Sequence, residues 1–201
     1  MSGLRERKKQ ETRQQISDMA SWLFMQRGFD TVTVAEIAEA ASVSTKTVFN
    51  YFPRKEDLFL DRIPEATDLI TRTVRERPAD MEPLTALRQA AVRLVREGHP
   101  LGGIGEGYEH FVRVVVNSPA LRARVREFVD EVEDLLAKLF EEIEAKGPWS
   151  RVSAALVVAA VRSTYATSFR RLLDGDRPED IRDDHIVLLN RSFDVLERAL
   201  A

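Results

Sequence analysis

A short segment of the chain carries side chains that suit contact with nucleic acid. Residues 45–51 offer hydroxyls, an amide, an ammonium group and two aromatic rings, with no acid among them. As a helix, the segment would present outward Thr45, Lys46, Thr47, Phe49, Asn50 and Tyr51. Lys46 could donate to guanine or phosphate, Asn50 could pair with adenine, and Phe49 could touch a thymine methyl group. The alternative is a helical hairpin with a merely polar outer face.

Capping residues define two short helices around this segment. Thr33 and Glu36 have the spacing of a capping box, which predicts that a helix starts directly after Thr33. Ser44 is a favourable N-cap for a second helix over 45–51. The apolar residues of the first helix share one face and are Val34, Ile37, Ala38 and Ala41. Two helices joined by so short a turn form a helix-turn-helix.

The sequence SVSTKTVFNYFPRKEDL, residues 42–58, resembles the recognition-helix signature of the TetR (tetracycline-repressor) family of bacterial transcription regulators. In that signature, Val-Ser-x-x-Thr-apolar-aromatic-x-Tyr-Phe is followed by the Lys-Glu-Asp-Leu start of a fourth helix. The similarity extends back over the first sixty residues or so, through core and turn positions. These positions are Ile16, Ala20, Leu23, Phe24, Gly28, Phe29, Thr31, Val34, Ile37 and Ala38.

The resemblance implies an all-α fold with an N-terminal three-helix DNA-binding domain and a C-terminal helical ligand-binding and dimerisation domain. We expect these at 1–54 and 55–201, with about nine helices in all. The implied activity is that of a homodimeric repressor released from its operator by a small molecule. The expected partners are double-stranded DNA, a second copy of the chain and an unknown effector, with no cofactor. The expected DNA contacts are Thr33, Ser44, Thr45, Lys46, Thr47, Phe49, Asn50, Tyr51 and Lys55.

Composition is compatible with this interpretation. The 201 residues are 44% hydrophobic, enough for one small and one larger core, and there is no cysteine for a disulfide or thiolate metal site. The chain opens without a signal-like apolar segment, and its longest apolar run, 154–161, is too short to cross a bilayer. We therefore expect a cytoplasmic protein.

Charge is distributed unevenly along the chain. The whole sequence has a net charge of −3, but residues 1–55 hold nine Lys or Arg against six acids, so the remainder carries −6. A basic N-terminal part on an acidic body is the arrangement expected of a DNA-binding protein. The basic arm at 5–9 would contact phosphate or the minor groove, or would be a solubilising tail.

Helical patterns cover the rest of the chain. Beyond the helix-turn-helix we expect helices at 6–27, 55–77, 83–98, 105–117, 119–146, 151–173 and 183–200. Pro64 lies inside the second of these and predicts a kink or a break there. The glycine-rich stretch 99–107 lacks the spacing of a phosphate-binding loop and is expected to be a connection or a gate.

The last two predicted helices carry more apolar residues than one buried face needs. In the final helix, apolar residues recur at three- and four-residue spacing at Ile186, Leu189, Phe193, Leu196 and Leu200. Paired with their copies in a second subunit, the two helices would form a four-helix bundle. The alternative is that both helices close the core of a single subunit. The resemblance favours the dimer.

Candidates for an effector site are polar residues in the apolar C-terminal part. They are Tyr108, His110, Arg113, Trp149, Thr164, Tyr165 and Ser168, each of which could equally be a core or rim residue. The three histidines are too dispersed to predict a metal site. No HExxH, GxSxG or kinase pattern predicts catalysis, so an enzyme is not expected. The alternative is a DNA-binding protein that responds to no ligand. An internal cavity would favour the ligand-responsive regulator over this alternative.

Overall fold

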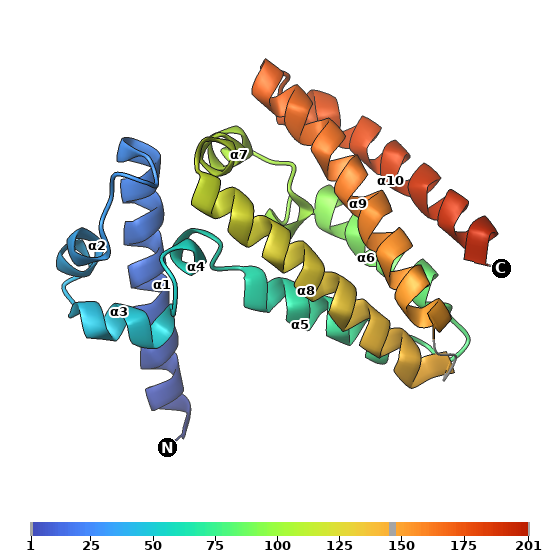
Figure 1. The fold of residues 1–201 in the computed structure, drawn as a ribbon, viewed down its shortest axis with the longest axis horizontal. Helices are drawn as coiled ribbons and strands as arrows, with labels where there is room; N and C mark the ends of the chain where they lie inside the picture. The colour runs from blue at the N-terminus through green and yellow to red at the C-terminus, as the bar shows by residue number, and fades with distance from the viewer. Residues whose placement is uncertain (1, 145–147, 201) are drawn as a thin grey trace. The chain divides into compact units, whose positions relative to one another are not determined.

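The computed structural model describes residues 2–144 and 148–200. Within these ranges it has ten α-helices, one 3-10 turn and no strand (Figure 1). The predicted all-α fold is confirmed. The chain forms two compact units, one made of the residues up to Ile63 with Arg113–Arg124, the other of Pro64–Val112 with the chain from Val125 on. The functional domain limits at 1–54 and 55–201 stay a prediction.

The first unit is built around its N-terminal helix. Its elements are α1 (Ser2–Arg27), α2 (Val34–Ala40), α3 (Thr45–Tyr51) and α4 (Glu56–Phe59). Helix α1 packs against α2 and α4, and α2 packs against α3 (Figure 1). The fully buried side chains between these helices include Ile16, Phe24, Ile37, Val48, Phe52 and Leu58. They bury the apolar face that the sequence pattern predicts.

The predicted caps of α2 and α3 and the predicted end of α1 are confirmed, whereas α1 begins at Ser2, earlier than the predicted residue 6. The Thr33 side chain accepts from the Glu36 amide while the Glu36 carboxylate accepts from the Thr33 amide, which is a complete capping box. The Ser44 hydroxyl accepts from the Thr47 amide at 3.0 Å. Gly28 ends α1 with φ +83°, a left-handed conformation that favours glycine.

The predicted helix at 55–77 is two helices in the structure. Helix α4 ends at Phe59, and α5 (Ile63–Arg75) begins after a three-residue break. Pro64 is the second residue of α5, where its missing amide proton costs no helical hydrogen bond. The predicted break therefore exists, but it lies before Pro64, and the proline starts a helix instead of kinking one.

The second unit consists of longer helices. They are most of α5, α6 (Pro83–Arg96), the 3-10 turn η1 (Pro100–Gly102), the start of α7 (Tyr108–Asn117), most of α8 (Pro119–Glu144), α9 (Pro148–Asp174) and α10 (Pro178–Leu200). Helices α9 and α10 lie side by side, and α10 also packs against α6 (Figure 1). Both begin earlier than predicted because a proline occupies the first turn of each. The end predicted for α8, Lys146, lies outside the described residues.

The apolar pattern of the final helix belongs to the subunit's own core. Leu189, Phe193 and Leu196 are buried in one cluster with residues of α8 and α9, such as Leu139 and Val157. Assigning Leu189 and Phe193 to a dimer interface is therefore wrong for these residues. A dimer would need other positions on the same helices.

Helix α9 is long and apolar enough, by length and composition alone, to cross a membrane over Trp149–Asp174. This stretch is longer than the apolar run at 154–161. One such helix says little about a membrane, because core helices of soluble proteins meet the same criterion. Here one side of α9 packs against α10, and much of the remainder is exposed.

A buried histidine joins α9 to α10. His185 is only 1% exposed, and its Nδ1 lies 2.7 Å from the Ser168 hydroxyl. The edge of its ring packs against Tyr165, with ring centroids 4.8 Å apart. Its Nε2 has no hydrogen-bond partner among the described residues. Burial lowers the pKa of His185 from 6.5 to about 4, because the charged form would lose its hydration.

Acidification should therefore destabilise the fold through His185. The unfolded chain binds a proton near pH 6.5 and the folded chain only near pH 4, so stability contributed by neutral His185 is complete above pH 6.5 and declines towards pH 4. We expect a loss of up to about 3 kcal/mol over this window. Urea unfolding of the unmodified protein between pH 4 and 7 measures it. His185→Gln should flatten the profile, whereas His110→Gln, at an exposed position, should not; equal slopes in all three proteins would contradict the assignment.

Candidate DNA-binding surface and effector cavity

The orientation of α3 is set by one buried side chain and one tight turn. Val48 is completely buried, which turns the opposite face of α3 outward. Before α3, Ser42 takes a left-handed conformation with φ 54°, and the Val43 amide donates to the Ala38 carbonyl at 2.9 Å. This tight turn, residues 41–44, is the whole connection between α2 and α3. The direction of the outward face of α3 therefore depends on contacts within the first unit.

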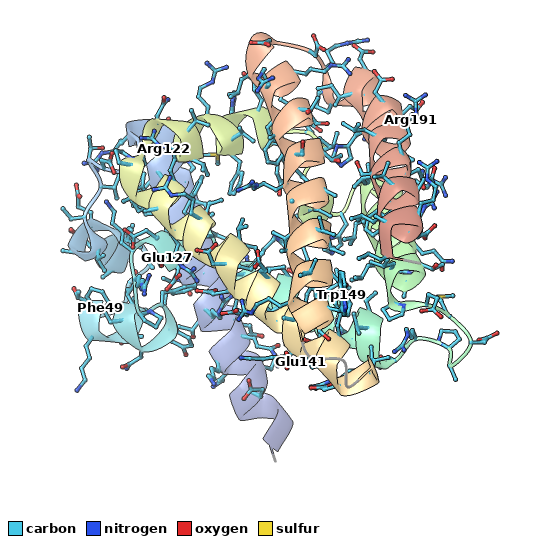
Figure 2. The ribbon with its side chains drawn as sticks, turned by 45° about the vertical axis from the view of Figure 1, so that its right-hand side comes forward. Phe49, Arg122, Glu127, Glu141, Trp149 and Arg191 are labelled. Atoms are coloured by element: carbon cyan, nitrogen blue, oxygen red, sulfur yellow. The ribbon has the colours of Figure 1, made fainter. Side chains whose placement is uncertain are left out.

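The outward face of α3 is polar and carries no acid. Thr45, Lys46, Phe49 and Asn50 are exposed, and Phe49 keeps 48% of its surface accessible. Figure 2 shows Phe49 on the outer side of this helix. Within the described ranges, neither Lys46 nor Asn50 makes a side-chain hydrogen bond or an ion pair. An exposed aromatic ring beside an uncommitted ammonium and amide suits the floor and edges of a DNA groove.

Three of the predicted DNA contacts already have a local role. The Thr33 hydroxyl donates to Glu36 Oε2 at 2.8 Å, and the Ser44 and Thr47 hydroxyls lie 2.8 Å apart. The hydrogen bond from the Thr33 amide, helped by Arg27, lowers the pKa of Glu36 to about 2. Glu36 therefore stays ionised and holds the capping box closed. Tyr51, at the end of α3, is half-buried.

Lys55 takes up a position that sequence reasoning missed. Its ammonium donates to the Phe29 carbonyl at 2.5 Å and lies 4.3 Å from the centre of the Phe29 ring and 5.6 Å from that of Phe24. Desolvation lowers its pKa. Lys55 thus ties the start of α4 to the end of α1, and its predicted contact with phosphate would have to come in addition to this role.

A segment from the middle of the chain completes the first unit. The Ser118 hydroxyl donates to Asp30 Oδ1 at 2.8 Å, and Arg124 Nε donates to Asp57 Oδ1 at 3.0 Å. The Arg124 side chain is only 11% exposed in this ion pair. Ser118 also caps α8 by accepting from the Leu121 amide. These two hydrogen bonds, across 88 and 67 residues of sequence, tie the N-terminal part of the first unit to its second segment, Arg113–Arg124.

The seven predicted effector contacts do not form one site. Arg113 belongs to the first unit, and His110 is exposed. Thr164 and Ser168 are buried and bonded within the fold, to the Ala160 carbonyl and to His185. The remaining three are Tyr108, Tyr165 and Trp149; the first two bond backbone carbonyls of η1, at Pro100 and Leu101. The packing of Tyr165 also explains Gly103, where φ is +69° and a Cβ would lie 2.5 Å from the Tyr165 ring.

A cavity of about 830 Å³ lies elsewhere in the second unit. It is formed where α6 and α9 begin and α8 and α10 end. Its lining is Glu82, Pro83, Leu84, Thr85, Phe140, Ile143, Trp149, Ser150, Ser153, Glu197, Ala199 and Leu200. Of the seven predicted contacts, only Trp149 is among them. The cavity went unpredicted because it depends on four helix ends that are distant in sequence.

Residues 16–61 match the family model described as bacterial regulatory proteins, tetR family. The chain is also 34% identical over 140 residues to the HTH-type transcriptional regulator TcmR of Streptomyces glaucescens. The chain belongs to the TetR family. This match covers 68% of the chain and spans 62% of the length of TcmR. As a member of this family the chain carries its DNA-binding helix-turn-helix, which here comprises α2 and α3.

Solved structures of TetR-family members share the fold. NalD of Pseudomonas aeruginosa, described as the secondary repressor of a multidrug efflux pump, is similar with a TM-score of 0.58 at 20% identity, covering 92% of this chain and 97% of NalD. SmeT, described as the repressor of a Stenotrophomonas maltophilia multidrug efflux pump, has a TM-score of 0.58 at 14% identity, covering 91% of this chain and 89% of SmeT. At these identities the likeness concerns the fold alone.

Replacing Lys55 should weaken the fold of the first unit. Lys55→Met keeps the length of the side chain but removes the charged donor to Phe29 and the cation above the two rings. We expect a loss of about 1–3 kcal/mol of unfolding free energy, measured by chemical denaturation. Lys46→Met is the matched control, since Lys46 is exposed on α3 and should leave stability unchanged. If both variants are as stable as the unmodified protein, the interior role of Lys55 is wrong.

Proposed function

We propose that this protein is a homodimeric transcriptional repressor that binds operator DNA through α3 and is released by a small molecule. The observation that carries the proposal is the exposed, acid-free face of α3, where Lys46, Phe49 and Asn50 stand free while Val48 fixes the helix. NalD and SmeT, which are both repressors, support repression as the direction of regulation. A repressor of this kind acts in the cytoplasm.

Each subunit would place α3 in a major groove. Lys46 and Asn50 would contact base edges or phosphates, and the Phe49 ring would lie against thymine methyl groups. The positive balance of the first 55 residues supports attraction to phosphate, whereas the rest of the chain is acidic. The exposed side chains of the basic segment, Lys8 and Lys9, lie on α1 and would add charge near the backbone.

The exposed faces of α9 and α10 support a homodimer. Val152 and Leu156 on α9 are 42% and 39% exposed, and Val187 and Val195 on α10 are 49% and 56% exposed. They follow helical spacing on the side of each helix that faces away from the subunit core. Large apolar side chains in a row on a soluble protein mark a surface that another molecule covers. A second copy would cover it with an identical surface around a two-fold axis.

The cavity in the second unit supports an effector. The cavity is partly open to solvent, and its volume falls within the range of sites for small organic ligands, which is compatible with a sensor. The effector would lower DNA affinity by binding better to a conformation in which the two α3 helices cannot both reach their half-sites. The ligand contacts predicted at Tyr108, Tyr165 and their neighbours stay a prediction.

Removing the free polar groups of α3 should weaken DNA binding without unfolding the protein. We expect Lys46→Ala and Asn50→Ala each to lower affinity by about fivefold to a hundredfold, the effect of a lost base or phosphate contact. The measurement is fluorescence anisotropy at fixed salt, on a site selected from random DNA with the unmodified protein. Lys138→Ala, an exposed lysine of α8, is the matched control. Unchanged affinity for the DNA site in both α3 variants would show that α3 is not the recognition helix.

Charges on the exposed face of α9 and α10 should produce monomers. Leu156→Glu and Val187→Glu would place a carboxylate in the proposed interface, where it would lose its hydration without gaining a partner. Sedimentation equilibrium at micromolar concentration should show a dimer for the unmodified protein and a monomer for each variant. Val116→Glu, at a similarly exposed valine of α7, should stay dimeric. A monomeric unmodified protein, or dimers of both variants, would contradict this interface.

A further inference from the structure

The cavity at the end of the second unit has an apolar wall with acidic groups. Phe140, Ile143 and Leu84 line it together with short hydroxyl side chains. The charged residues among its described lining are Glu82 and Glu197, so this described part of the lining holds two acids and no base. An anionic ligand would meet repulsion there. A neutral ligand that filled the cavity would strip water from two carboxylates and give nothing in return.

The two carboxylates differ in how far they are already compensated. Glu82 precedes α6, is exposed and has no hydrogen bond or ion pair within the described ranges. Glu197 Oε2 lies 3.5 Å from Arg88 Nη1, but the same nitrogen approaches Asp194 more closely, at 2.8 Å. The Arg88 Nε donates to Asn190 at 2.8 Å. Glu197 Oε1 also accepts from the Thr85 hydroxyl at 3.5 Å. Glu197 is therefore partly compensated, and among the described lining residues Glu82 is the acid that has no partner.

An aromatic ring stands at the cavity beside these acids. Trp149, labelled in Figure 2, lies in the first turn of α9. It lines the cavity and keeps 66% of its surface accessible. The face of an indole attracts organic cations more strongly than other aromatic side chains do. An exposed indole, an apolar wall and two carboxylates together match a ligand with a flat apolar body and a positive charge.

We propose that this cavity binds a flat organic cation. Glu82 would supply the main ion pair, Trp149 would stack on the ligand, and Phe140 with Ile143 would cover its apolar edge. A metal ion is a poor match, because the described residues contain no group of three metal-binding side chains. Binding itself needs only the second unit, and its effect on DNA rests on the proposed function above.

Tryptophan fluorescence can follow this site selectively. The chain has two tryptophans, so Trp22→Phe leaves Trp149 as the only reporter. The probes are three molecules of one ring system, namely 10-methylacridinium as cation, 10-methylacridone as neutral ring and acridine-9-carboxylate as anion. In the DNA-free protein, we expect the cation to quench Trp149 with an affinity about tenfold above that of the neutral ring. The anion should not bind measurably, and the cation should bind more weakly as salt rises.

Two matched variants distinguish an ion pair with Glu82 from nonspecific binding of the probes. Glu82→Gln should weaken binding of 10-methylacridinium about fivefold and leave binding of 10-methylacridone unchanged. Glu97→Gln, at the exposed opposite end of α6, should change neither. Equal affinity for cation and neutral ring, or an effect of Glu97→Gln as large as that of Glu82→Gln, would overturn the proposal.

The same samples show whether the cation-site proposal or the proposed repressor function is wrong. If Trp149 emission changes with protein concentration and no probe competes, a second copy of the chain covers the cavity and the proposal is wrong. Binding to the selected DNA site without any probe tests the repressor independently. DNA binding with no quenching by the cation would reject the cation site alone. Quenching with no DNA binding would reject the repressor alone.

Discussion

Helices as short as α2 and α3 are not stable in water without tertiary contacts. Each has seven residues, and helix formation becomes favourable without tertiary support only at about twice that length. Their shape therefore depends on burying Ile37 on α2 and Val48 on α3 within the first unit, where neither side chain has any exposed surface. The caps at Thr33 and Ser44 limit fraying but cannot replace this burial. The polar face of α3 is consequently only as well oriented as the core beneath it, and Lys55, held against two rings of that core, belongs to the same support.

In the second unit, α9 and α10 each carry apolar side chains on two faces, of which the subunit buries only one. Leu189 and Phe193 point into the subunit, whereas Val187 and Val195 on the same helix point out of it. A single subunit can bury only the first set, since one side of each helix already meets its neighbours. This explains why α9 is apolar enough to resemble a membrane span, and why a helix-helix interface between copies is the simpler explanation of its exposed side.

The sequence predicted what depends on residues close together in the chain. The capping box at Thr33, the N-cap at Ser44 and the glycine that ends α1 each act within four residues, and all three are confirmed. It could not predict contacts that the tertiary fold decides. Lys55 meets a carbonyl 26 residues away, and Ser118 bonds an acid 88 residues away. Which of two apolar faces turns inward also depends on neighbouring helices, so Leu189 was assigned to the wrong side. The cavity is the extreme case, because four helix ends define it.

An effector bound in the second unit could influence α3 only through the places where the chain connects the two units. It passes between them at three places, between Ile63 and Pro64, within α7 after Val112, and within α8 after Arg124. The break between α4 and α5 makes the first passage compliant, whereas the other two lie inside continuous helices. Near the start of α8, Arg124 Nε donates to Asp57 Oδ1 of α4 at 3.0 Å, so the helix that carries the chain into the second unit is itself anchored in the first.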